Sequence, residues 1–125
     1  MGKAVHILFI DNDEAIRRLF GGKLASAGFE MLYAEDGNEG REIARRMQPD
    51  LILLDIRMPD PDGYTVARRL KGERKTAHIP IVFFTNEDFT PEAEKMLKEA
   101  WITDYIHKSV TPSELVERIQ GIIGR

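Results

Sequence analysis

Polar side chains follow four apolar runs of this 125-residue sequence, each at the point where the run ends. The four groups are Asp11-Asn12-Asp13, Asp55, Thr85-Asn86-Glu87 and His107-Lys108. Carboxylate and amide oxygens suit Mg²⁺, which takes few protein ligands and keeps several waters. A carboxylate such as Asp55 can act as a nucleophile toward phosphorus, while phosphoryl oxygens need cations and donors such as Lys108 and Thr85 around them. Gathered in one place, these residue types predict phosphoryl-transfer chemistry.

The intervening sequence alternates between strand and helix patterns, which would gather these groups. Apolar runs predict strands at 5–10, 29–34, 51–55, 81–84 and 104–107. Periodicity and capping residues predict helices that open after Asp13, near Asn38, at Tyr64, after Thr90 and after Thr111. Because crossovers between parallel strands are nearly always right-handed, five such βα units predict one sheet with helices on both faces. Ligands of such sheets bind outside the carboxyl ends of the strands.

Composition narrows the class of protein. The length suits one domain with its own core, and the lack of cysteine excludes disulfides and thiolate zinc sites. The longest apolar runs are far shorter than the roughly 20 residues of a membrane helix. The net charge is −3 and the Arg-Arg pairs form no long basic stripe, so we expect no direct nucleic-acid binding. We expect a cytoplasmic protein that makes no membrane contact.

Some expectations concern single side chains. The helix near Asn38 should turn Ile43 and Met47 inward and stop before Pro49. The three histidines, His6, His78 and His107, are not at ligand spacing, so we expect no role for them.

Four motifs together resemble the receiver domains of two-component response regulators. They are the acidic cluster at Asp11, the stretch Asp55-x-x-Met58-Pro59-x-x-Asp62-Gly63, Thr85 and Lys108, and the resemblance covers all five βα units. It implies a flavodoxin-like, doubly wound, five-stranded parallel sheet in the order 2-1-3-4-5 with five helices. It also implies that residues 1–125 are a single receiver domain with no effector domain present.

The resemblance implies a role for each polar group around Asp55. Asp55 would be the phosphoacceptor, loaded from a phosphohistidine on a sensor histidine kinase or a phosphotransfer protein. Asp11, Asn12, Asp55 and the backbone carbonyl of Arg57 would hold Mg²⁺ or Mn²⁺. The product would be an aspartyl phosphate, formed and hydrolysed by the domain itself, with no turnover of an external substrate.

Further roles follow from the same resemblance. Thr85 and Lys108 would bind the phosphoryl oxygens. Tyr105 stands at the family's switch aromatic, whose ring turns inward when the Thr85 hydroxyl is drawn to the phosphoryl group. This change would alter the face formed by the fourth helix, the fifth strand and the fifth helix, through which receivers often form homodimers and where an unknown downstream effector would bind. Arg57 and Glu87 stand where the family tunes the access of water, and they either pair across the site or remain solvated.

Three positions depart from the family pattern. Asn12 stands where the family usually has a second acid, which predicts weaker Mg²⁺ binding. Asp13 either leans toward the metal site and compensates for the missing charge, as a modulator of the site, or caps the next helix. Ser109 follows Lys108 where the family usually has proline after a cis peptide bond. Either the Lys108–Ser109 bond is a strained cis bond, or the loop takes another route. Trp101 either packs between the fourth helix and the fifth strand or is an exposed anchor for a partner.

Three functions are compatible with these observations to different degrees. The first is a phosphorylation-dependent signalling switch. The alternative is a receiver-like interaction module whose output does not depend on phosphorylation, which Asn12 and Ser109 favour. The third is an aspartyl-phosphate phosphatase on the same scaffold, but the chain lacks the cap segments and second catalytic acid that such an enzyme needs. The sequence therefore predicts the switch.

Overall fold

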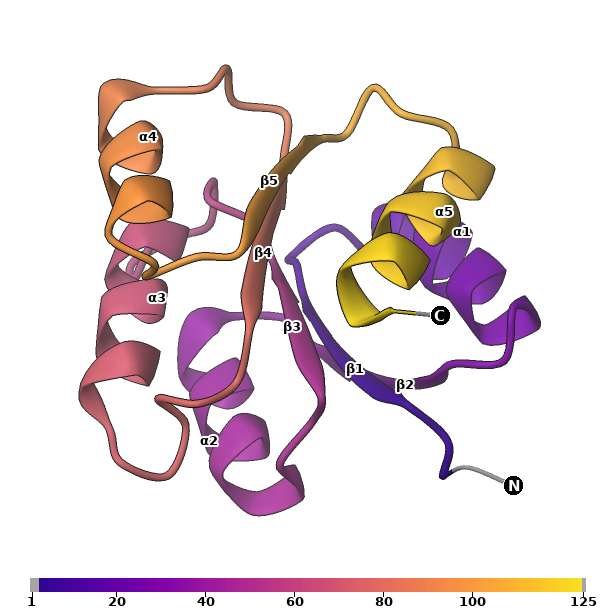
Figure 1. The fold of residues 1–125 in the computed structure, drawn as a ribbon, viewed down its shortest axis with the longest axis horizontal. Helices are drawn as coiled ribbons and strands as arrows, with labels where there is room; N and C mark the ends of the chain where they lie inside the picture. The colour runs from indigo at the N-terminus through magenta and orange to yellow at the C-terminus, as the bar shows by residue number, and fades with distance from the viewer. Residues whose placement is uncertain (1–2, 125) are drawn as a thin grey trace.

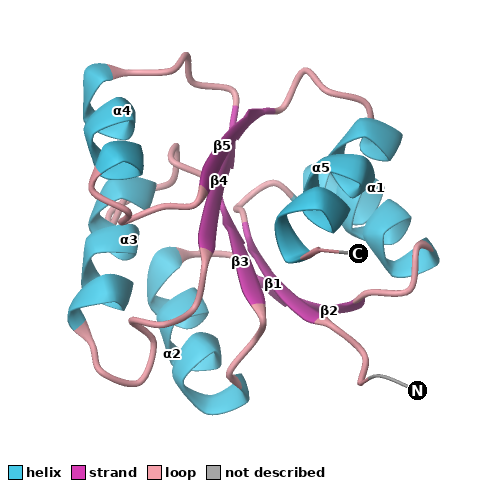
Figure 2. Cartoon of the chain, in the orientation of Figure 1, coloured by secondary structure: helices cyan, strands magenta, loops and turns pink. Residues whose placement is uncertain are grey.

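The computed structural model describes residues 3–124 and shows a parallel sheet between two layers of helices (Figures 1 and 2). The strands are β1 (His6–Ile10), β2 (Glu30–Ala34), β3 (Leu51–Leu54), β4 (Ile81–Thr85) and β5 (Asp104–His107). The helices are α1 (Glu14–Ser26), α2 (Gly37–Met47), α3 (Gly63–Gly72), α4 (Pro91–Lys98) and α5 (Pro112–Ile123). All neighbouring strands run parallel in the order β2-β1-β3-β4-β5, which confirms the predicted fold class and strand order.

The core has two halves because the central strands are buried on both faces, as parallel strands usually are. Helices α1 and α5 cover one face, and α2, α3 and α4 cover the other (Figure 1). Successive residues point to opposite faces. In β4, Phe83 therefore packs into the half beneath α3 and α4, and Phe84 packs into the half beneath α1 and α5. The parallel strands between these two layers bring their carboxyl ends to one edge of the sheet.

Short polar side chains begin the helices. The residues that accept hydrogen bonds from backbone N–H groups in the first turn are Asp13, Asp36, Asp62, Thr90 and Thr111. Thr111 and Glu114 form the predicted reciprocal capping box. These caps satisfy orphan N–H groups, and a lost cap typically costs about 1 kcal/mol. Three of them stand in or just beyond the loops that follow β1, β3 and β4, so they help to hold the site.

Gly63 sets how closely α3 approaches the end of β3. A Cβ atom there would collide with the carbonyl oxygen of Asp55 and with the Cα of Ile56. The N–H of Gly63 donates to the Ile56 carbonyl at 2.9 Å. The Asp62-Gly63 turn therefore folds directly onto the backbone that carries Asp55.

The structure corrects one expectation and decides another. Ile43 packs against the core as predicted, but Met47, the last residue of α2, is half exposed, so the prediction that it turns inward was wrong. The helix ends there, and Gln48 turns the chain with a left-handed backbone. Trp101, which lies between α4 and β5 in the chain, is partly buried against the core, which favours the packing interpretation over the exposed anchor. Among the helices of residues 3–124, none has the length and apolarity that crossing a membrane requires.

Candidate functional site

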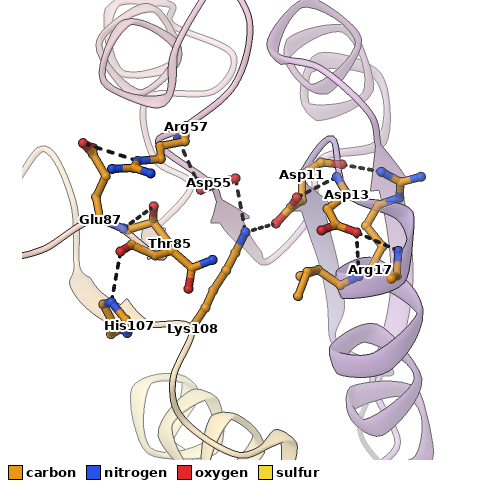
Figure 3. Close-up of polar contacts among 12 residues, drawn as sticks. Asp11, Asp13, Arg17, Asp55, Arg57, Thr85, Glu87, His107 and Lys108 are labelled. Atoms are coloured by element: carbon orange, nitrogen blue, oxygen red, sulfur yellow. Dashed lines mark hydrogen bonds and ion pairs between the residues drawn. The ribbon is translucent and has the colours of Figure 1, made fainter.

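Four side chains meet at the carboxyl edge of the sheet, as the sequence predicted (Figure 3). Asp11 follows β1, Asp55 follows β3, Thr85 ends β4 and Lys108 follows β5. The two aspartates and Thr85 are almost fully buried, with exposed fractions of 0% for Asp11, 4% for Asp55 and 0% for Thr85. A buried carboxylate is costly unless it is paired, so the partners of these two acids decide what the site can do.

Lys108 lies between the two carboxylates (Figure 3). Its Nζ is 2.7 Å from Oδ2 of Asp11 and 3.2 Å from Oδ2 of Asp55, and its side chain is only 6% exposed. The contact with Asp55 is also a hydrogen bond. The contact with Asp11 has the distance of an ion pair but not the angles of a hydrogen bond, so Asp11 Oδ2 has a charge partner and no directed donor. A single ammonium thus neutralises part of a two-acid site.

Asp11 is held in a poorly solvated position. Its Oδ1 accepts the N–H of Asp13 at 2.8 Å, and its own N–H donates to the Ala34 carbonyl at 3.1 Å. Burial raises the pKa of Asp11 above its ordinary value of 3.8, although Lys108 and the Asp13 N–H oppose the rise. The ionised form of Asp11 is therefore less stable in the fold than in water, and a further cation would stabilise it.

The residues at this edge fit a hard cation with few protein ligands. Oδ2 of Asp11 lacks a directed donor, and Asp55 presents a second carboxylate on the other side of Lys108. Asn12 is exposed beside them, and the carbonyl of Arg57 belongs to the loop after β3. Residues 3–124 contain no group of three or more acidic, histidine or cysteine side chains that could hold a metal. Two carboxylates with water suit Mg²⁺, which does not need a protein cage.

Asp13 caps α1. Its Oδ1 accepts the N–H groups of Ala15 at 2.9 Å and Ile16 at 3.3 Å, and the residue is exposed. Of the two interpretations of Asp13, the structure supports the helix cap. Arg17, one turn into α1, donates to the backbone carbonyl of Asp11, which ties this helix to the site.

Arg57 and Glu87 face each other across the mouth of the site (Figure 3). Nε of Arg57 is 3.7 Å from Oε1 of Glu87, and their side chains are 69% and 26% exposed. A pair this exposed contributes about 0–1 kcal/mol, so it bridges the loops after β3 and β4 without locking them. Of the two alternatives, pairing and solvation, the structure shows pairing. The N–H of Arg57 also donates to Oδ1 of Asp55 at 3.3 Å.

A chain of hydrogen bonds leads from Thr85 to Tyr105. Oγ1 of Thr85 accepts the N–H of Glu87 at 3.2 Å, and the Tyr105 hydroxyl donates to the carbonyls of Glu87 and Asp88. Burial raises the pKa of Tyr105 to about 12, so the hydroxyl keeps its proton. The Tyr105 ring lies edge-on to Phe89 with centroids 5.0 Å apart. Residues of β4, the β4–α4 loop and β5 are therefore linked directly.

The loop after Lys108 takes a route that the sequence left open. The cis peptide bond in residues 3–124 is Asp60–Pro61, so Lys108–Ser109 is trans and carries no cis strain. Lys108 reaches the site nevertheless. His107, for which no role was expected, contacts both neighbouring loops: its Nδ1 is 3.1 Å from the Ser109 nitrogen, and its Nε2 is 3.1 Å from the Asn86 carbonyl. The sequence feature that could have indicated this role is His107 directly before Lys108, together with Ser109 directly after it, which has a backbone N–H that proline would lack.

Comparison with known proteins identifies the family. The sequence model of the response regulator receiver domain matches residues 7–120. The chain belongs to this family. The receiver is 34% identical over 119 residues to the DNA-binding dual master transcriptional regulator RpaA of Synechocystis, covering 95% of this chain and 49% of RpaA. It is 36% identical to the phosphate regulon transcriptional regulatory protein PhoB of Pseudomonas aeruginosa, covering 95% and 52%. The receiver therefore spans about half the length of these two relatives.

Solved structures show the same fold. The chemotaxis protein CheY4 of Vibrio cholerae superimposes with a TM-score of 0.87 at 26% identity, covering 96% of this receiver and 99% of that chain. The BeF3-activated N-terminal receiver domain of RstA from Klebsiella pneumoniae superimposes with a TM-score of 0.82 at 29% identity, with the same coverage. The receiver thus superimposes along nearly its whole length on a chemotaxis protein and on the N-terminal receiver domain of RstA.

Proposed function

We propose that this receiver is a phosphorylation-dependent switch in which Asp55 accepts a phosphoryl group from a sensor histidine kinase or phosphotransfer protein. The observation that carries the proposal is the buried carboxylate of Asp55 at a sheet edge, 3.2 Å from the Lys108 ammonium and beside Asp11. Because burying a carboxylate is costly, Asp55 does not stabilise the core at this position, and its placement favours a chemical role. Membership of the receiver family agrees with this role.

In the transfer, a carboxylate oxygen of Asp55 bonds to phosphorus while the bond from phosphorus to the histidine nitrogen breaks. The imidazole leaves, and an acyl phosphate forms. Lys108, already at Oδ2 of Asp55, moves its charge to a phosphoryl oxygen. The Thr85 hydroxyl accepts from Glu87 in this structure and can still donate its own proton to another phosphoryl oxygen.

Mg²⁺, or Mn²⁺, would be held by Asp11, Asn12, Asp55 and the backbone carbonyl of Arg57, and it would neutralise charge on the phosphoryl oxygens. These residues fit it because Asp11 Oδ2 has no directed donor and burial raises the pKa of the Asp11 carboxyl. Asn12 supplies an amide oxygen and no charge, so binding is weaker than in a receiver with two adjacent acids. Asp13 supports the site only indirectly, because it caps α1.

The signal leaves through the contact between Thr85 and Glu87. When the Thr85 hydroxyl turns to the phosphoryl group, it releases the N–H of Glu87. The carbonyl of the same residue, Glu87, accepts the Tyr105 hydroxyl. The β4–α4 loop and Tyr105 then move together, which changes the face of α4, β5 and α5. Phe89 and Leu97 are exposed, 50% and 36% respectively, in the loop before α4 and in α4 itself. An effector or a second receiver would read this face, without direct contact to nucleic acid.

The arrangement also sets the lifetime of the acyl phosphate. The pair of Arg57 and Glu87 spans the mouth of the site at 3.7 Å, and the Arg57 side chain is 69% exposed, so the pair restricts water only partly. Autodephosphorylation is therefore expected to proceed without a partner, and to speed up when Glu87 is replaced by a small residue.

Incubation with phosphoramidate and Mg²⁺, followed by intact mass measurement, tests the proposal. We expect one added phosphoryl group in the natural chain and none in Asp55→Asn. Asp60→Asn is the matched control, since Asp60 is an exposed aspartate of the same loop and should be phosphorylated normally. Addition that survives in Asp55→Asn refutes the assignment. No addition to the natural chain favours the interaction module that works without phosphorylation.

A further inference from the structure

The turn between β5 and α5 presents Lys108 to the site. The N–H of Lys108 donates to the Thr85 carbonyl at 2.8 Å, which continues the pairing of β4 with β5. The N–H of Val110 donates to the His107 carbonyl at 3.3 Å, so residues 107–110 form a tight turn with Lys108 and Ser109 at its centre. The direction of this turn decides whether the Lys108 side chain points between Asp11 and Asp55.

The His107 ring connects this turn to the neighbouring loop. The Ser109 N–H can only donate, so Nδ1 of His107, 3.1 Å away, must accept. The Asn86 carbonyl can only accept, so Nε2, also 3.1 Å away, must carry the proton. One neutral tautomer, with its proton on Nε2, satisfies both contacts. Figure 3 shows the ring of His107 reaching the loop after β4, and the contact with Ser109 ties the same ring to the turn after β5.

We infer that His107 is a positioning residue for Lys108 in phosphoryl transfer. The inference rests on the proposed function and deepens it. A side chain that accepts the N–H two residues later is the arrangement by which Asn and Asp stabilise turns. It needs an N–H at position 109, which Ser109 has and proline would lack. His107 and Ser109 thus orient this trans turn together, where a Lys-Pro bond would restrict it covalently.

The first test compares rates of phosphoryl incorporation from phosphoramidate in three variants. His107→Ala loses both ring contacts, and since each hydrogen bond contributes a factor of about three to ten, we expect a rate about tenfold to a hundredfold lower. His107→Asn keeps an acceptor for the Ser109 N–H, so we expect its rate to return to within about threefold of the natural chain. His78→Ala, an exposed histidine far along the chain, is the matched control and should not change the rate.

The second test reads the ring directly. Nitrogen-15 NMR of the natural chain should show a protonated Nε2 and an unprotonated Nδ1 on His107, with the Ser109 amide protected from hydrogen exchange. A proton on Nδ1, or a freely exchanging Ser109 amide, overturns the inference. If His107→Ala does not fold, His107→Gln keeps only the contact to Asn86 and should show the same loss of Ser109 protection.

A double-mutant cycle separates this inference from the proposed function. If His107 positions Lys108, His107→Ala should shift the unfolding equilibrium about fivefold less in a Lys108→Met background than in the natural chain. Additive effects overturn the inference even where no phosphorylation occurs. A natural chain that takes no phosphoryl group overturns the proposed function instead, and a His107→Ala rate equal to that of the natural chain overturns the inference alone.

Discussion

Replacing Lys108 by methionine should destabilise the metal-free receiver strongly. The ammonium lies 2.7 Å from Asp11 and 3.2 Å from Asp55, and its side chain and both carboxylates are at most 6% exposed. The magnitude is therefore that of a broken buried ion pair, about 3–5 kcal/mol, and not the 0–1 kcal/mol of a surface pair. Two buried carboxylates would remain without a cation. For a chain of this length, the loss lowers the Tm by about 12–20 °C.

Urea unfolding in metal-free buffer at pH 7 measures this loss. Lys98→Met is the matched control, because Lys98 pairs with Glu94 at 3.7 Å on the surface with its side chain 75% exposed. The control should change stability by less than about 0.5 kcal/mol. The same experiment with Mg²⁺ is expected to return more stability to Lys108→Met than to the natural chain, because the cation no longer competes with the ammonium for the two carboxylates.

The reasoning has clear points of failure. If Lys108→Met lies within about 1 kcal/mol of the natural chain without metal, the two carboxylates are solvated or protonated and the bridge does not hold the site. If Mg²⁺ stabilises both proteins equally, Lys108 and the metal do not share ligands, and the assignment of Asp11 as a metal ligand fails.

Three further predictions concern neighbouring positions. Asn12→Asp should tighten Mg²⁺ binding by up to about thirtyfold, since Asn12 is exposed and a unit charge beside a dication in water contributes up to about 2 kcal/mol; an unchanged dissociation constant in calorimetry contradicts this. Asp11→Asn should be more stable than the natural chain without metal at pH 7. Because the pKa of Asp11 is raised in the folded state, the natural chain regains stability as the pH falls through that pKa, and it does so fully below the ordinary 3.8. The difference in unfolding free energy between Asp11→Asn and the natural chain, measured with urea, should therefore shrink between pH 7 and pH 4. A difference that stays constant over this range refutes the prediction. Gly63→Ala should cost about 1–3 kcal/mol by pressing on the Asp55 backbone, whereas Gly72→Ala, with open space around it, should cost nothing, and equal melting temperatures for the two variants would disprove the close approach.

Local sequence carries most of the fold. The predicted strands and helices agree with the structure to within a residue or two, because β1 to β4 each hold a run of four apolar residues and five polar caps mark the helix starts. Met47 shows the limit of periodicity: it has the spacing of an inward residue, but it is the last residue of α2 and its side chain is 50% exposed. Whether a side chain in the last turn of a helix is buried depends on which residues pack against that turn.

Residue types and order along the chain also predicted which side chains gather, since parallel strands place all their carboxyl ends at one edge. Asp11, Asp55, Thr85 and Lys108 needed no structure to be singled out. The choice between alternatives did need one. Asp13 became a helix cap only when its distances to Ala15 and Ile16 were known.

What the sequence by itself determined is the chemistry available at the edge of this sheet: a carboxylate nucleophile, a second acid, a hydroxyl and an ammonium, with Asn12 in place of an acid. Only the tertiary structure decided how they are used in the metal-free state. Lys108 and Asp55 are 53 residues apart, and the ring of His107 contacts Asn86 across 21 residues. Contacts of this kind depend on angles and distances of a few tenths of an ångström, which the packing of the two helical layers sets and which no local pattern encodes.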